Sequence, residues 1–142
     1  MSMPNKIKVP ATLDNLHKAM EFVIAYAETT GFPQERIMDI ELALEEVLVN
    51  IINYAYPNGA GEMEITCTPY NESGFAMEVV DQGIPFDVLG VGDPDVASGI
   101  EDRKVGGLGI YFVRKLMDDV SYVREGENNI LKLFVLKDRK EN

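Results

Sequence analysis

Residues 42–55 read LALEEVLVNIINYA, and this stretch decides the fold. Apolar side chains recur here, and in the residues just before it, at steps of three and four, which is the spacing of one helical face. Pro33 suits a first helical turn and Pro57-Asn58-Gly59 ends the pattern, so we predict a helix from about Pro33 to Tyr54 or Ala55. Its apolar stripe, which indicates packing against a sheet, consists of Ile37, Ile40, Leu44, Val47, Leu48, Ile51 and Ala55.

A row of polar residues, Glu46, Asn50 and Asn53, falls on roughly the opposite side of this helix. Leu42 and Val49 flank the row, so we expect it to line a cavity rather than to face open water. The functional interpretation makes Asn50 a Mg²⁺ ligand through its amide oxygen, and Glu46 a carboxylate that accepts a proton from a hydroxyl or a water. For an isolated Glu-x-x-x-Asn, an ordinary polar helix surface is the commoner explanation.

The elements on either side of this helix predict a two-layer arrangement. A first helix is expected from Thr12 or Asp14 through Ala27, and a third from about Gly107 to Met117. The predicted strands are Lys6 to Val9, Glu62 to Tyr70, Phe75 to Asp81, Ser121 to Arg124 and Ile130 to Leu136. The fold class is therefore an α/β two-layer sandwich, in which helices cover one face of a mixed, mostly antiparallel sheet.

One predicted strand ends in a carboxylate followed by a glycine turn, Asp81-Gln82-Gly83. Burying a carboxylate at the end of an apolar strand is costly unless a donor satisfies it. An exocyclic amine such as that of adenine would be such a donor, and Gly83 would let a ligand approach the backbone closely. An ordinary junction between a strand and a turn explains an isolated Asp-x-Gly equally well.

Gly106-Gly107-Leu108-Gly109 stands at the start of the third predicted helix. Free main-chain N–H groups at a helix N-terminus bind phosphate, whereas the alternative is a flexible loop end. The chain contains no G-x-x-x-x-G-K-[ST] and no G-x-G-x-x-G after a strand, so it is neither a P-loop protein nor a dinucleotide-binding protein of that kind. The preceding loop, with a lid expected from Gly90 to Val105, has no apolar period, and a loop of this length is usually functional or disordered.

The composition predicts one soluble domain spanning residues 1–142. The hydrophobic share of 46% is enough for a single core. A formal charge of -11 argues against nucleic-acid binding, which depends on clustered Lys and Arg. The single cysteine, Cys67, excludes a disulfide framework and predicts a cytoplasmic location, and no run approaches the ~18 apolar residues of a membrane span. With His17 as the only histidine, Ser-His-Asp and Cys-His sites are excluded.

In this order, the motifs resemble those of the GHKL ATPase superfamily, which is shared by the ATP-binding domains of gyrase, mismatch-repair proteins and histidine kinases. Within it, the chain is most similar to bacterial anti-sigma factor serine kinases, from about Thr12 to Val135. The matching motifs are Glu46-x-x-x-Asn50, Asp81-x-Gly83-x-Pro85-Phe86, Gly107-Leu108-Gly109 and Leu116-Met117-Asp118-Asp119-Val120. The resemblance implies a Bergerat-type ATP-binding fold.

The resemblance also implies roles for individual residues and for partners. Glu46 would be the general base, Asn50 the Mg²⁺ ligand with Asn53 beside it, and Asp81 with Gly83 the contact to adenine. The phosphates of ATP would be held by Gly106, Gly107, Leu108 and Gly109. Proteins of this kind bind a sigma factor, phosphorylate a serine or threonine of an anti-sigma factor antagonist, and typically form homodimers.

Three functions therefore compete. An ATP- and Mg²⁺-dependent serine/threonine kinase acting as an anti-sigma factor is favoured, because a pure binding module has no need for Glu46. The alternatives are a nucleotide-responsive binding protein without kinase activity and a stand-alone ATP-binding component of a two-component-like system. A complete histidine kinase is not expected, since one histidine on one helix cannot supply a phosphoacceptor hairpin.

Overall fold

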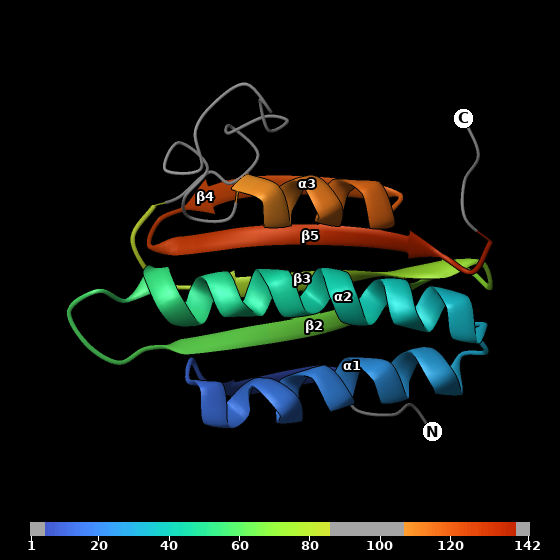
Figure 1. The fold of residues 1–142 in the computed structure, drawn as a ribbon, viewed down its shortest axis with the longest axis horizontal. Coiled ribbons are helices and arrows are strands. Elements are labelled where there is room, and N and C mark those ends of the chain that lie inside the picture. Colours follow the sequence, from blue (N-terminus) through green and yellow to red (C-terminus); the bar gives the residue numbers. More distant parts are fainter. Residues whose placement is uncertain (1–4, 86–106, 139–142) are drawn as a thin grey trace.

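The computed structural model of this chain describes residues 5–85 and 107–138, and these form one sheet covered by helices. The sheet has the order β1-β2-β3-β5-β4. Helices α1 (Leu16–Thr29), α2 (Gln34–Asn50) and α3 (Gly107–Leu116) lie on one face of it (Figure 1). The strands are β1 (Lys6–Pro10), β2 (Glu62–Tyr70), β3 (Gly74–Asp81), β4 (Asp119–Glu125) and β5 (Asn128–Leu136). The predicted two-layer sandwich is confirmed.

The prediction of a mixed sheet was wrong, because all four strand pairings among the described residues are antiparallel. β3 does not pair with β4, the strand that follows it in the chain. β5 lies between them instead, so that α3 joins two strands that run in the same direction without being neighbours. A connection through a helix therefore creates no parallel pair here.

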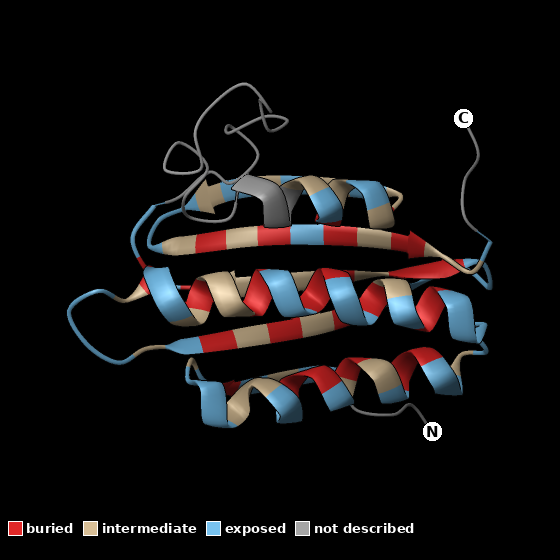
Figure 2. Cartoon of the chain, in the orientation of Figure 1, coloured by how far each residue is buried: buried red, intermediate tan, exposed pale blue. Residues whose placement is uncertain are grey.

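The strands alternate between residues that face the helices and residues that face away (Figure 2). The inward positions of β3 and β5 are apolar and almost fully buried along most of their length, where they pack under α2. At one end this same alternation continues into two polar residues, Asp81 of β3 and Asn129 of β5, which the register places side by side. A polar site thus begins where the apolar core ends.

The second helix has the predicted extent but changes its winding near its end. After α2, the chain continues as a π-helical turn, η2 (Ile51–Ala55). A 3₁₀ turn, η1 (Leu13–Asn15), precedes α1. In a π turn each hydrogen bond spans five residues instead of the four of an α-helix, and such turns are frequent at functional sites. The turn carries Asn53 and ends at Ala55, two residues that return in the site described below.

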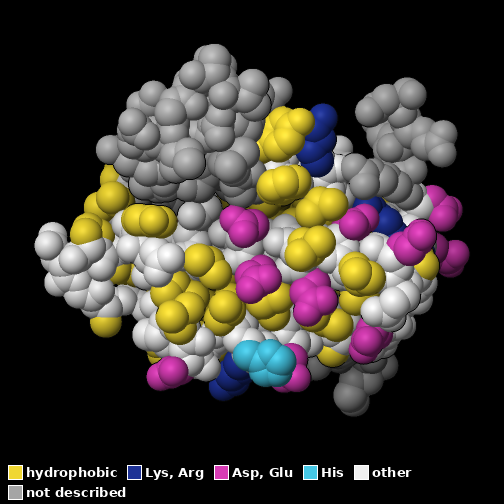
Figure 3. Space-filling model, in the orientation of Figure 1, with side chains coloured by type: hydrophobic (Ala, Val, Ile, Leu, Met, Phe, Trp, Pro, Cys, Tyr) yellow, Lys and Arg dark blue, Asp and Glu magenta, His cyan; other side chains and the backbone are white. Residues whose placement is uncertain are grey.

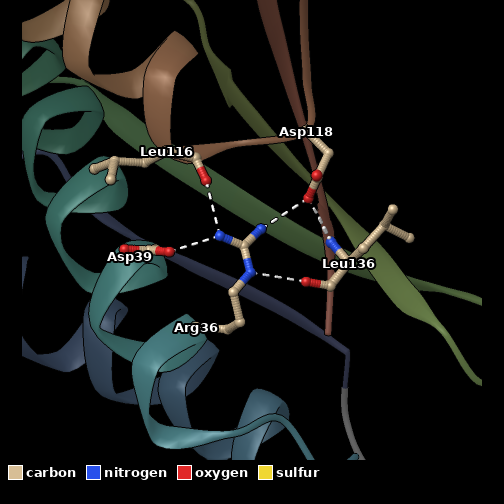
Figure 4. A network of polar contacts seen from close by, with 5 residues as sticks. All are labelled: Arg36, Asp39, Leu116, Asp118 and Leu136. Atoms are coloured by element: carbon tan, nitrogen blue, oxygen red, sulfur yellow. Dashed lines mark hydrogen bonds and ion pairs between the residues drawn. The ribbon is translucent and has the colours of Figure 1, made fainter. Parts of the chain in front are cut away.

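Arg36 is a buried cation that joins α2 to α3 and to the sheet (Figure 4). Its guanidinium donates to the carboxylates of Asp39 at 2.6 Å and Asp118 at 2.7 Å. It also donates to two backbone carbonyls, that of Leu116 at the end of α3 at 3.2 Å and that of Leu136 at the end of β5 at 2.9 Å. One side chain therefore fixes the C-terminal end of α3 against α2.

We expect Arg36→Met to lower the free energy of unfolding by about 3–5 kcal/mol, because it removes a charged donor from four acceptors in a buried position. Urea unfolding followed by circular dichroism measures this change. The matched control is Lys8→Met, which breaks an exposed ion pair of 3.5 Å with Glu62 and should cost less than about 1 kcal/mol. Equal losses in the two variants would contradict a structural role for Arg36.

Cys67 is buried on β2, and burial raises the pKa of its thiol to about 12, so the thiol stays protonated at neutral pH and is no nucleophile. None of the helices in residues 5–85 and 107–138 is long and apolar enough to cross a membrane.

Candidate functional site

A cavity of about 460 Å³ opens at the end of the sheet where Asp81 and Asn129 lie. Its walls come from the last turn of α2, from η2, and from β3, β4 and β5. Apolar side chains form much of the wall, namely Val47, Ile51, Val79, Ile84 and Leu131. Three residues that the sequence predicted for one site, Asn50, Asn53 and Asp81, all line this cavity. An apolar cleft with a few polar groups is the usual form of a small-molecule site.

Asp81 is buried, with 7% of its surface exposed, yet half of its carboxylate is already satisfied. Oδ1 accepts the backbone N–H of Gly83 at 2.8 Å and the side-chain N–H of Asn129 at 2.9 Å. Among the described residues, no donor lies on Oδ2. The second oxygen is therefore the one left to accept a hydrogen bond from a ligand, which refines the sequence prediction for this residue.

Asn129 is a site residue that the sequence analysis missed. It is 6% exposed and lines the cavity beside Asp81. Its Nδ2 donates to Asp81 and, at 2.8 Å, to the carbonyl of Ile84, while its Oδ1 accepts from the Tyr122 hydroxyl at 2.6 Å and from Arg124 at 3.2 Å. The signal in the sequence was the alternation of β5. Asn129 occupies the same face of the strand as Leu131, Leu133 and Val135, which are all buried and apolar.

Gly83 is needed because the chain passes very close to η2. A Cβ placed on Gly83 would lie 2.2 Å from the carbonyl oxygen and 2.5 Å from the Cβ of Ala55. The same carbonyl of Ala55 accepts the N–H of Ile84 at 2.9 Å, so the turn after β3 is bonded directly to the π-helical turn. The sequence analysis predicted that Gly83 lets a ligand approach the backbone, whereas in the structure the segment that approaches Gly83 is Ala55 of η2. Gly83 itself does not line the cavity.

Tyr56 holds the same turn from the other side. Its hydroxyl accepts the N–H of Gln82 at 2.8 Å and donates to the carbonyl of Glu62. Burial raises the pKa of Tyr56 above its ordinary value. The backbone that follows Asp81 is therefore fixed at Gln82, at Gly83 and at Ile84, and this fixes the orientation of the carboxylate.

Asn50 lines the cavity and carries an amide donor that is not paired within the described residues. Its Nδ2 is fully buried and has no hydrogen-bond partner among the described residues, which costs about 1–3 kcal/mol unless an acceptor such as a phosphate oxygen fills the place. The described residues contain no group of three or more acidic, histidine or cysteine side chains that could together hold a metal ion. An ion bound through Oδ1 of Asn50 would then take its other oxygens from phosphate and water, as Mg²⁺ commonly does.

The predicted polar row divides into two parts in the structure. Asn50 is half-buried and Asn53 is exposed at the edge of the cavity, whereas Glu46 is exposed and does not line it. The expectation that the row avoids open water was therefore wrong for Glu46. Leu42, which was expected to shield it, is itself 53% exposed, because no described element packs over this side of α2.

The glycine block begins α3 as predicted. Gly107, Leu108 and Gly109 are the first three residues of that helix, while Gly106 lies outside the described residues. The predicted lid from Gly90 to Val105 also lies outside them.

Comparisons with known proteins give the family of the chain and some of its relatives. A family model described as the histidine kinase-like ATPase domain matches residues 9–135. The serine-protein kinase RsbW of Bacillus cereus strain AH187 is 29% identical over 142 aligned residues, which cover 96% of this chain and 88% of that protein. The serine-protein kinases RsbW of Bacillus thuringiensis strain Al Hakam and of Bacillus anthracis are 28% identical with the same coverage.

Proposed function

Because this chain belongs to the histidine kinase-like ATPase family, we propose that the cavity beside Asp81 binds ATP. The observation that carries the proposal is the buried carboxylate of Asp81, which keeps one oxygen without a donor among the described residues at the wall of an apolar cavity. The 6-amine of adenine would donate to that oxygen, and the apolar walls at Val79 and Leu131 would pack against the base.

The phosphates would extend from the base toward α3 and the end of α2. Main-chain N–H groups of Gly107, Leu108 and Gly109, the first residues of α3, would hold them, together with that of Gly106, which precedes them in the sequence. Asn50 would bind Mg²⁺ through its amide oxygen, with Asn53 at the edge of the same space. The ion, when bound, neutralises charge that develops on the transferring phosphoryl group.

We further propose that the chain is a protein serine/threonine kinase. Its relatives are named serine-protein kinases, and they match nearly the whole chain. In the transfer, the hydroxyl oxygen of the substrate forms a bond to the γ-phosphorus of ATP. The bond between the γ-phosphorus and the oxygen that bridges it to the β-phosphorus breaks, and ADP leaves. Glu46 takes the proton of the hydroxyl. The exposure of Glu46 supports this role, since a hydroxyl on another protein can approach only from the solvent side.

The proposed partners are a sigma factor, which the protein would sequester, and an anti-sigma factor antagonist, which it would phosphorylate on serine or threonine. Figure 3 shows acidic side chains interspersed with hydrophobic ones over the helical face. Met38, Leu42 and Phe112 are each more than half exposed on α2 and α3. Such a surface suits a protein partner with basic and apolar groups. We also propose that the chain is a single domain that acts in the cytoplasm and forms a homodimer.

Incubation with Mg-ATP and candidate antagonist proteins tests this function. We expect one antagonist to acquire a phosphate on a single serine or threonine, mapped by mass spectrometry, and we expect no transfer when EDTA removes the metal. Phosphate found on a histidine or an aspartate of a partner would favour the two-component-like alternative.

A binding protein without kinase activity is the second candidate, and the position of Glu46 outside the lining of the cavity is the observation that favours it. In that case the chain would bind nucleotide and a sigma factor, yet label none of the antagonists offered to it. Tight ATP binding with complete absence of transfer would support this candidate over the kinase.

A further inference from the structure

Asn129 has no polar atom to spare for a ligand. Both N–H bonds of its Nδ2 are used, one on Asp81 and one on the carbonyl of Ile84, and its Oδ1 accepts from Tyr122 and Arg124. The orientation of the amide follows from its partners: turned around, its oxygen would face a carboxylate and a carbonyl, which are both acceptors. Asn129 therefore has no hydrogen bond to offer a bound base and acts on the polar groups of the base through Asp81.

The contact with Asn129 decides how many donors Asp81 can receive from a ligand. Oδ1 already accepts two hydrogen bonds, from Gly83 and Asn129, which leaves Oδ2. A carboxylate with two open oxygens can pair with two adjacent donors, such as the N1–H and 2-amino groups of guanine. A carboxylate with one open oxygen suits a single donor, such as the 6-amine of adenine. Guanine has a carbonyl at that position, and the carboxylate would repel it.

We infer that Asn129 is a specificity-determining residue, which makes the cavity prefer adenine to guanine by occupying Oδ1 of Asp81. The inference rests on the proposed ATP site and adds to it the means by which the base is selected. A site of this kind discriminates because the wrong base binds with polar groups left unpaired. The free-energy cost of burying those unpaired groups is larger than the free energy gained from one good hydrogen bond to the right base.

Neighbouring side chains keep Asn129 in this position. Arg124 donates to Asn129 and, at 2.8 Å, to the carbonyl of Gly83, so it connects β4 to the turn after β3. Tyr122 donates to Asn129 at 2.6 Å. Because Arg124 also donates to the Oδ1 of Asn129, Tyr122→Phe removes one of two supports and leaves the contact between Asn129 and Asp81 in place.

Calorimetric titration of the full chain with Mg-ATP and with Mg-GTP tests the inference. We expect the unaltered chain to bind ATP at least about a hundredfold more tightly than GTP. In Asn129→Leu, and in Asn129→Ser as a second variant with a shorter side chain, the ratio of the two affinities should fall at least about tenfold. Oδ1 of Asp81 then keeps only the N–H of Gly83 and can accept a second donor, from guanine. Tyr122→Phe is the matched control and should change the ratio less.

A purely structural role for Asn129 would change both affinities in parallel and leave their ratio constant, which would overturn the inference. Equal binding of GTP and ATP by the unaltered chain would also overturn it, and this measurement needs no variant to fold. Binding of neither nucleotide by the unaltered chain would be a different result, since it would overturn the proposed function and the inference with it.

Discussion

Asp81→Asn is expected to weaken ATP binding by about a thousandfold while the chain stays folded. The substitution replaces an acceptor with an amide group that can keep its oxygen on Gly83 and Asn129, so the contacts within the protein survive. The amide N–H₂ then occupies the place of Oδ2 and faces the 6-amine of adenine, donor against donor. The complex loses a charge-assisted hydrogen bond and leaves two donors unpaired, which together cost about 4 kcal/mol. Calorimetric titration with Mg-ATP measures the change.

Glu78→Gln is the matched control for this variant. Glu78 lies on the same strand as Asp81, at a position that alternates with the buried residues Met77 and Val79 and so faces away from the helices. We expect its affinity for ATP to equal that of the unaltered chain. Unchanged affinity in Asp81→Asn, with the same thermal unfolding midpoint, would show that the base does not bind at this carboxylate.

Glu46→Ala is expected to separate binding from chemistry. Glu46 does not line the cavity, so ATP affinity should change by less than about threefold, a difference worth well under 1 kcal/mol. Transfer of phosphate to the antagonist should slow by about 10²–10⁴-fold, the usual contribution of a positioned general base. Single-turnover assays with labelled ATP measure the transfer step, and calorimetry measures the affinity.

Glu45→Ala provides the comparison for this second variant, because Glu45 is also an exposed carboxylate on α2 and precedes Glu46 directly. It removes the same charge from the same surface without removing the proposed base. A transfer rate that falls equally in both variants would indicate a general electrostatic effect on docking. A rate that falls in neither would contradict the role of Glu46.

Local patterns were enough to predict the elements and part of the site. The three- and four-residue spacing of the second helix and the alternation in the strands reflect burial on one side of each element, which depends on near neighbours in the sequence. Asp81 and Gly83 could be predicted as site residues because a carboxylate and a glycine follow the alternating apolar residues of the strand. Asn50 followed from its spacing to Glu46 on the helix.

The remaining features depend on residues that are distant in the sequence. Asn129 became a candidate only when the register placed β5 beside β3, an order that no local pattern encodes. Arg36 looks like a surface residue of an amphipathic helix until α3 and β5 bring acceptors to it. The exposure of Glu46 likewise depends on which elements pack over α2, and flanking apolar residues could not reveal that.

A crystal structure of the chain with Mg²⁺ and a non-hydrolysable ATP analogue tests the central claim most directly. We predict that adenine lies in the cavity between η2 and β3, with its 6-amine within hydrogen-bond distance of Oδ2 of Asp81 and with Oδ1 still bonded to Gly83 and Asn129. A nucleotide whose base lies outside this cavity, or whose base makes no contact with Asp81, would contradict the account.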